Sequence, residues 1–422
     1  IDPELSNLTP LHDYPIYGQD QRKESFADLP KQTPMNLMAL VKRTPTMSLR
    51  DLMKVPSWPT LEMLSYEKER TFREYDGTTA GEFLDSLRFP PEARQMLFDV
   101  FAHSFFNPEE DMSAAEMMKL FHFYFTGNPE GLVFDVLNQP FSTGLWDPMR
   151  SHLEKLGVTF HLNTRVEKLA VTKRGWRLTS QGQRKRFEAD GIVLAANTGA
   201  LQRIISNSDG LGDTDWNTQI DGLDSTLPFA VWRLWLDRDT VAGREPFVGT
   251  AGLGLLDNIS LYHLFQDESR TYVEKHGGSI VELHGYAVPN GLSEEAIKKD
   301  LWENFVATYR EFEGATVRAE RFRLDQDCPA FRPGDYAKRP GIKTPFPGLC
   351  LAGDFVRLDI PAALMEGAVT SGFLAANELL NGWSVRGEDI MSVPLEGLLS
   401  KVAPRFNSKR PPTRYPHRTA SS

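Results

Sequence analysis

The stretch LCLAGDFVRLDIPAALMEGAVTSGFLAANELL, residues 349–380, contains a short apolar strand, a turn and a helix rich in small side chains. A run of this length and composition is typical of a buried strand. Gly353 allows the backbone to approach another group closely. Asp354 then follows at the carboxyl end of the strand, where ligands bind in open α/β sheets. Its carboxylate would repel a phosphate but can accept a hydrogen bond from a sugar or ribityl hydroxyl.

The helix that follows suits the same ligand site. Pro361 is predicted to open this helix, because its missing N–H costs nothing in the first turn. Unpaired N–H groups at a helix start favour negative charge by about 0.3–2 kcal/mol, and reduction places such a charge on a flavin ring. The alternative interpretation is an ordinary strand-to-helix turn with a capping aspartate.

Residues 352–377 resemble the C-terminal flavin motif of the carotene desaturase and amine oxidase superfamily, a Gly-Asp turn followed by a Met-Glu-Gly-Ala-x-x-Ser-Gly helix. The segments FHFYFTGNPEGLVF (121–134), LYHLFQD and SIVELHGYAV are similar to the isorenieratene-synthase type, the carotene β-ring desaturase/methylases. The resemblance implies FAD as cofactor. It also implies which residues bind the cofactor: Val166, Gly353, Asp354, Pro361, Ala363, Leu364 and Met365.

The superfamily's GxGxxG fingerprint does not occur in this sequence, and GTAGLGLLDN (249–258) is interpreted as a loop. The chain also begins with Ile1, without signal-peptide character. We therefore expect the sequence to be a fragment of a longer product, lacking an N-terminal βαβ unit that would hold the FAD pyrophosphate. Such a fragment alone is expected to be inactive.

The overall pattern predicts an α/β fold, with an incomplete FAD-binding domain of the Rossmann-like, glutathione-reductase type and an inserted α+β substrate domain. Residues 1–144 are predicted to form a mainly helical substrate or cap region, in which Thr79 with Glu82 and Ser113 with Glu116 have capping-box spacing. The other predicted parts are 145–210 and 339–384 in the FAD-binding domain, 211–338 as a substrate-binding sheet domain, and 385–422 as an extension with a disordered tail.

Aromatic residues are the expected walls of a carotene site, because a hydrocarbon is held by apolar burial and aromatic faces stabilise cationic intermediates. The predicted substrate-binding residues are Phe121, Phe123, Tyr124 and Phe125, although such a stripe also suits a plain core. His122 and Glu130 are the candidates for proton transfer. The alternatives are a structural histidine and an exposed turn glutamate.

Composition excludes several classes of function. The net charge of -10 disfavours nucleic acid, and two cysteines and nine histidines without metal-binding spacing argue against a metal site. A cytoplasmic protein in peripheral contact with membrane is expected, from the apolar substrate. The basic tail is either solvated or a weak tether to anionic lipid.

The predicted function is therefore FAD-dependent desaturation of a carotene β-ring, with a methyl shift, to an aromatic end group. Two alternatives stay open. One is another flavoenzyme, a carotene desaturase or isomerase or an amine oxidase. The other is a non-catalytic fragment.

Overall fold

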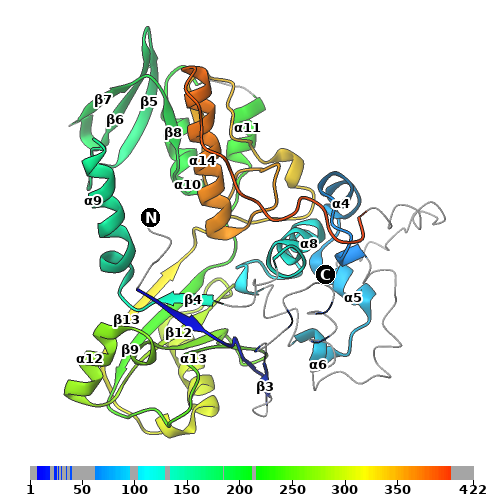
Figure 1. Cartoon of the computed structure of the whole chain (residues 1–422), viewed down its shortest axis with the longest axis vertical. Coiled ribbons are helices and arrows are strands. Elements are labelled where there is room, and N and C mark those ends of the chain that lie inside the picture. The colour runs from blue at the N-terminus through cyan, green and yellow to red at the C-terminus, as the bar shows by residue number, and fades with distance from the viewer. Residues whose placement is uncertain are drawn as a thin grey trace, which may run out of the picture.

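The computed structural model describes most of the chain (Figure 1). The described residues are 7–19, 23–25, 27, 30, 35, 39, 62–95, 103–128, 134–183, 185–211 and 215–400. The predicted tail at 401–422 and the candidate base Glu130 lie outside them.

A large sheet forms the lower part of the molecule, with strand order β13-β9-β12-β11-β10-β2-β3 (Figure 1). Its strands are β2 (Ile16–Tyr17), β3 (Lys23–Glu24), β9 (Phe229–Leu236), β10 (Phe247–Thr250), β11 (Asn258–Leu261), β12 (Ser279–Gly285) and β13 (Val317–Asp325). Buried and partly buried residues alternate along β9, FAVWRLWL, as the period of two in a strand requires. The buried set packs with helix α13 (Glu294–Thr308) in one hydrophobic core. Helix α12 (Asp267–His276) joins β11 to β12 through a short 3-10 turn (Tyr262–Leu264).

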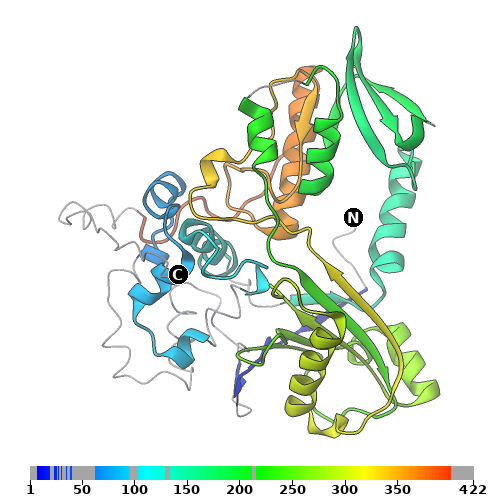
Figure 2. The same cartoon turned by 180° about the vertical axis from the view of Figure 1, so that it is seen from behind.

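The upper part of the molecule contains the flavin-like motif. Strand β14 (Leu349–Leu351) pairs in parallel with β8 (Ile192–Leu194), and the long helix α14 (Leu364–Gly382) lies beside them (Figure 2). Helices α10 (Thr198–Ser206) and α11 (Asp215–Asp221) lie nearby, and residues of both share a hydrophobic core with β8 and β14. A separate sheet of β5 (Val166–Thr172), β6 (Gly175–Ser180) and β7 (Arg186–Ala189) projects at the edge, and α9 (Asp147–Lys155) precedes it. This arrangement is an α/β fold.

Short helices form a third part, next to the start of α14. They are α4 (Lys68–Tyr75), α5 (Ala80–Leu87), α6 (Pro91–Arg94), α8 (Ala114–Phe121) and a π-helical turn (His122–Thr126). The capping box predicted at Thr79 and Glu82 forms in full. The one predicted at Ser113 is wrong, because the Ser113 hydroxyl bonds the Asp76 carboxylate at 3.0 Å and Glu116 has other partners.

Residues 1–144 also contain strands, which the prediction of a mainly helical region missed. Strand β1 (Leu8–Leu11) pairs antiparallel with β4 (Phe134–Leu137), while β2 and β3 extend the large sheet. These strands are short and their partners lie far away in sequence, so no local pattern marks them. The predicted loop at 249–258 begins inside β10 and ends at the first residue of β11.

The C-terminal extension returns to the helical part. Amides of Gly397 and Leu399 donate to the carbonyls of Tyr66 and Leu64, at 2.7 and 3.0 Å. Among the described residues, no helix has both the length and the apolar character needed to cross a bilayer. The MNLMALV stretch, 35–41, lies almost wholly outside the described residues.

Candidate active site

The turn after β14 has the geometry that its sequence predicted. Gly353 adopts φ +146°, and a Cβ built there would meet the Phe355 ring at 2.5 Å. Only glycine avoids both the backbone strain and this clash. Asp354 follows, partly buried, and burial is the main cause that raises the pKa of its carboxyl above the usual 3.8. The folded chain therefore holds a carboxyl in a place that disfavours its charge.

Helix α14 begins later than predicted. Pro361 is buried but lies before the helix, and the N-cap is Ala363 in an extended conformation. Ala363 offers no side-chain acceptor to the first-turn amides. Leu364 has φ +46°, a left-handed value uncommon for a leucine. The helix start is therefore left without a side-chain cap, which suits an external acceptor.

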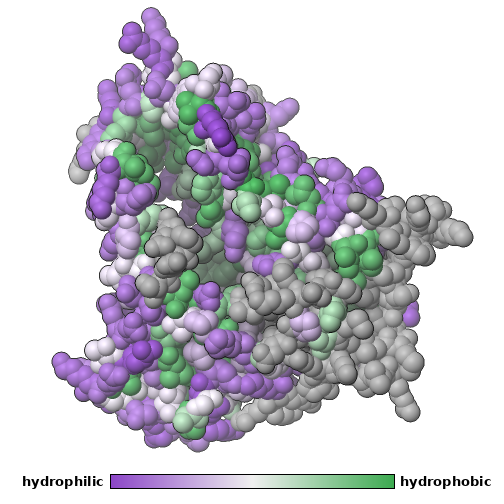
Figure 3. Space-filling model, in the orientation of Figure 1, coloured by the Kyte–Doolittle hydropathy of each residue, from purple (hydrophilic) through white to green (hydrophobic). Residues whose placement is uncertain are grey.

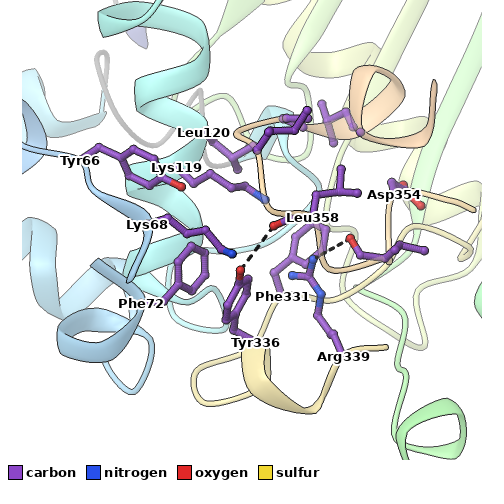
Figure 4. Close-up of a pocket in the computed structure, with 16 residues that line it drawn as sticks. Tyr66, Lys68, Phe72, Lys119, Leu120, Phe331, Tyr336, Arg339, Asp354 and Leu358 are labelled. Carbon is purple, nitrogen blue, oxygen red and sulfur yellow. Dashed lines mark hydrogen bonds between the residues drawn. The ribbon is translucent and has the colours of Figure 1, made fainter. Parts of the chain in front are cut away.

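Asp354 and the start of α14 open onto one narrow pocket (Figure 4). Ala362, Ala363, Leu364 and Gly367 line it on the motif side. Facing residues come from the helical part and from the segment before β14: Tyr66, Lys68, Phe72, Lys119, Phe331, Tyr336 and Arg339. Three of these side chains are basic, and each has a carboxylate partner: Glu116 for Lys119 and Arg339, and Asp359 for Lys68.

A buried ion-pair cluster fixes the turn against the helical part. Arg339 contacts the Glu116 carboxylate at 2.5 Å and donates to the carbonyls of Phe355 and Val356 at 3.1 and 3.3 Å. Lys119 lies 2.6 Å from the same carboxylate. Burial alone would raise the pKa of Glu116, but Lys119 and Arg339 together lower it. The cluster thus keeps Glu116 ionised and positions the residues that follow Asp354.

These residues fit the flavin end of FAD. The carboxylate of Asp354 can accept from ribityl hydroxyls, and the uncapped amides of α14 and the basic wall can face the ring. The sequence has no GxGxxG, so no residue is assigned to the pyrophosphate.

A second, apolar cavity adjoins the first. It encloses about 880 Å³, part of it open to solvent, within the range of typical ligand sites. Leu364 lines both cavities and so separates the flavin side from the apolar side. The other lining residues come from remote segments: Leu11, Tyr14, Ser104, Phe105, Tyr124, Phe125, Phe134, Asp135, Val136, Phe247 and Tyr286. On the face in Figure 3, apolar residues gather around the hollow between the upper and lower parts.

The predicted aromatic run divides between the cavity and the core. Tyr124 and Phe125 line the apolar cavity. Phe121 stacks on Phe125 at 4.8 Å, and Phe123 packs against the helical core. A π-helical turn over 122–126 changes which positions share a face.

The other predicted site residues that the structure describes lie away from the two cavities or point to solvent. His122 is buried, with one ring nitrogen 2.9 Å from the Thr126 hydroxyl and the other 2.7 Å from the Pro394 carbonyl, and it lines neither cavity. The structure therefore supports a structural histidine. Val166 packs against the core around β8, and Met365 is exposed. Among the residues that the structure describes, no three His, Cys, Asp or Glu side chains gather as a metal site.

The sequence interpretation missed Tyr14, Phe247 and Tyr286 as cavity residues. Tyr14 stacks on Phe247 at 5.2 Å, and burial raises its pKa to about 12. The available signal was in SIVELHGY, where Glu282, His284 and Tyr286 alternate with apolar residues. A period of two places them on one face of β12 and its continuation.

The carboxyl of Glu282, on this face of β12, has a strongly shifted pKa. Arg233 donates to it at 2.7 Å, Tyr262 at 3.0 Å, and a ring nitrogen of His284 lies 2.9 Å away. Burial alone would raise its pKa, but the hydrogen bond from His284 and the charge and hydrogen bond of Arg233 lower it from the usual 4.5 to about 2. The ionised carboxylate therefore stabilises the fold.

Glu282→Gln is expected to lower the free energy of unfolding by up to about 3 kcal/mol at neutral pH. A depressed acid pKa contributes stability above its unfolded value and loses it as pH falls through the folded value. The difference between variant and wild type should therefore shrink between pH 4.5 and about 2. Urea denaturation at a series of pH values measures it. A difference that does not change with pH contradicts the assignment.

Comparisons with known proteins identify the class of the protein. The family match shows a flavin-dependent oxidoreductase with FAD as cofactor. The chain belongs to the flavin containing amine oxidoreductases, a family that matches residues 2–380.

Two curated relatives are similar along most of the chain. A carotenoid phi-ring synthase of Streptomyces griseus is 39% identical over 398 residues, covering 94% of this chain and 77% of the relative. Another carotenoid phi-ring synthase, from Chlorobaculum tepidum, is 26% identical over 505 residues, covering 92% and 78%.

Solved structures of amine oxidases share the fold. A redesigned putrescine oxidase superposes with a TM-score of 0.62 at 13% identity, covering 90% of this chain and 87% of that chain. Cyclohexylamine oxidase from Brevibacterium oxydans IH-35A gives 0.61 at 12% identity, covering 90% and 84%. At these identities the likeness concerns the fold alone.

Proposed function

We propose that the protein desaturates a carotene β-ring, with a methyl shift, to an aromatic end group. One observation carries this proposal: an apolar, aromatic-lined cavity meets the flavin motif at Leu364. A hydrocarbon ring offers no polar group for recognition, so its binding depends on apolar area removed from water, worth about 25 cal/mol per Å². The relatives named carotenoid phi-ring synthase support the same substrate class.

Bound FAD supplies the two-electron oxidant for each desaturation. The residues of this chain bind and orient the substrate. Phe105, Tyr124 and Phe125 form the wall from the helical part, while Phe247 and Tyr286, with Tyr14 from the segment before β2, form the opposite wall. Their ring faces can stabilise the positive charge that develops when hydride leaves a ring carbon.

The decisive experiment examines the purified protein for bound flavin. β-Carotene is then supplied, and the products are analysed for aromatic end groups. Yellow protein with aromatic product is the expected result. Flavin without a carotenoid product, but with oxidation of an amine, would favour the amine oxidase alternative. A purified protein that binds no flavin would overturn the enzyme assignment.

Val136→Trp is expected to reduce carotene turnover about 5- to 100-fold while flavin stays bound. An oversized side chain in a formed cavity costs about 1–3 kcal/mol of accommodation, and Val136 lines the apolar cavity only. Val241→Trp is the matched control, since Val241 is 56% exposed in a loop. Product formation and the flavin spectrum are measured for both. Equal turnover in the two variants would exclude this cavity as the substrate site.

We also propose peripheral contact with membrane, the source of a carotene. Exposed apolar side chains lie on and around α9, including Phe141, Trp146, Leu156 and Leu162. Such a cluster suits the interface of a bilayer. Co-sedimentation with phosphatidylcholine vesicles, compared between wild type and Trp146→Glu with Leu162→Glu, measures this contact. Equal binding by both proteins would exclude this surface.

A further inference from the structure

A chain of hydrogen-bonded side chains leads away from the apolar cavity into the large sheet. Tyr286 lines the cavity, and His284 and Glu282 precede it at alternate positions of β12. Val281 and Leu283, on the opposite face, belong to the core beneath the sheet. One face of β12 therefore carries the hydrogen-bonded side chains, and the other face packs in the core.

The hydrogen bonds of this chain have a defined direction. One ring nitrogen of His284, Nε2, lies 2.9 Å from the Glu282 carboxylate, and the other, Nδ1, lies 3.0 Å from the Tyr286 hydroxyl. An ionised carboxylate only accepts hydrogen bonds, so Nε2 must carry the hydrogen. In a neutral imidazole, Nδ1 is then an acceptor, and the hydroxyl of Tyr286 donates to it. Burial raises the pKa of Tyr286 well above its usual value, which keeps this hydroxyl protonated.

Tyr286 is held firmly at the cavity wall. Its backbone amide donates to the Asp257 carboxylate at 2.6 Å, and its ring meets the Phe106 ring edge to face at 4.8 Å. Arg233 and Tyr262 hold the far end by donating to Glu282. Both ends of the chain therefore have fixed partners, as proton transfer within hydrogen-bond reach requires.

Ring desaturation needs such a group. Each oxidation removes a hydride from one carbon and a proton from its neighbour, and an apolar cavity offers the proton few acceptors. The titratable side chains on its wall are Tyr14, Tyr124, Asp135 and Tyr286. Asp135 is exposed to solvent, and Tyr124 interacts with the exposed Glu366. Tyr286 is connected to an imidazole and a buried carboxylate.

We propose that Tyr286, with His284 and Glu282 behind it, accepts the proton released in each ring desaturation, an inference that rests on the proposed function. The C–H bond beside the cationic carbon breaks, and its electron pair forms the new C=C bond. The proton bonds to Oη of Tyr286 as the hydroxyl proton of Tyr286 passes to Nδ1 of His284. FAD is the oxidant for the accompanying hydride loss. The positive charge moves from the substrate to an imidazolium beside the Glu282 carboxylate, so the step conserves charge.

Tyr286 is the catalytic residue in this assignment, while His284 and Glu282 are positioning residues. Tyr286→Phe removes only the hydroxyl, and we expect kcat for aromatic product to fall about 100-fold or more with KM and flavin content unchanged. Glu282→Asp should retain more activity than Glu282→Gln. Tyr272→Phe, on the surface of α12, is the control for loss of a phenol.

Nitrogen NMR of the His284 ring in the flavin-loaded protein gives a readout that does not depend on turnover. The Nε2–H form is expected in wild type, and its fraction should fall in Glu282→Gln. An Nδ1–H form in wild type overturns the proposal, as does wild-type kcat in Tyr286→Phe. A loss confined to Tyr124→Phe would assign the proton to Tyr124 instead. Absence of aromatic product from the wild type would overturn the proposed function itself, a different result from an active Tyr286→Phe variant.

Discussion

Asp354→Ala is expected to weaken flavin binding about 10- to 100-fold, because a hydrogen bond to a charged group contributes about 1.5–3 kcal/mol. Asp354→Asn should give a smaller loss, since its amide oxygen still accepts. Both variants and the wild type are measured by flavin titration of the purified protein. The physical reason is the position of the carboxylate, at the end of β14 and beside the uncapped start of α14.

The stability of the flavin-free protein distinguishes a ligand-binding carboxylate from a structural one. Burial raises the pKa of Asp354, so its charge opposes folding at neutral pH. Asp354→Asn removes that charge and should leave the free energy of unfolding equal to wild type or higher. Asp359→Asn is the control, because the Asp359 side chain is 95% exposed in its pair with Lys68. Unchanged flavin binding in Asp354→Ala would exclude the assignment of this turn.

Arg339→Met is expected to lower the free energy of unfolding by about 3–5 kcal/mol, because it removes one partner of a buried ion pair. Of its two described cations Glu116 would keep Lys119, and the carbonyls of Phe355 and Val356 would lose their Arg339 donor. Flavin affinity should fall as well, since these carbonyls directly follow Asp354. Urea denaturation and flavin titration measure the two effects.

Arg332→Met is the matched control for this prediction. Arg332 pairs with Asp224 at 2.6 Å, but both side chains are largely exposed, at 43% and 61%. Exposed pairs contribute about 0–1 kcal/mol. If the two variants lose equal stability, the Arg339 cluster does not hold the turn.

Local sequence patterns predicted the elements whose signal is contained in a few neighbouring residues. Buried and partly buried residues alternate along β9, FAVWRLWL, within the predicted sheet domain, and the spacing of Thr79 and Glu82 predicted a capping box that forms. The cap predicted at Ser113 failed because Arg339, 223 residues from Glu116 in sequence, takes its carboxylate. The Ser113 hydroxyl, also buried, donates to Asp76 instead.

In the candidate site, too, some features follow from neighbouring residues and others depend on packing. Residues of the resembled flavin motif are contiguous, so the resemblance could single out Gly353 and Asp354 from the sequence. The start of α14 at Leu364 could not be predicted from the sequence. Packing buries Pro361 outside the helix, and no local pattern shows this. The sequence also could not predict which aromatic residues of 121–125 line the cavity and which join the core. The π-helical turn that decides this depends on the surrounding structure.

The sequence by itself determined the α/β character and the Gly-Asp turn after β14, because both depend on adjacent residues and on strand or helix period. Only the tertiary structure decided the apolar cavity and the chain of hydrogen bonds behind Tyr286. The lining residues come from β1, the helical part, the large sheet and α14. Because these segments are far apart in sequence, their side chains line one cavity only after long-range packing brings them together.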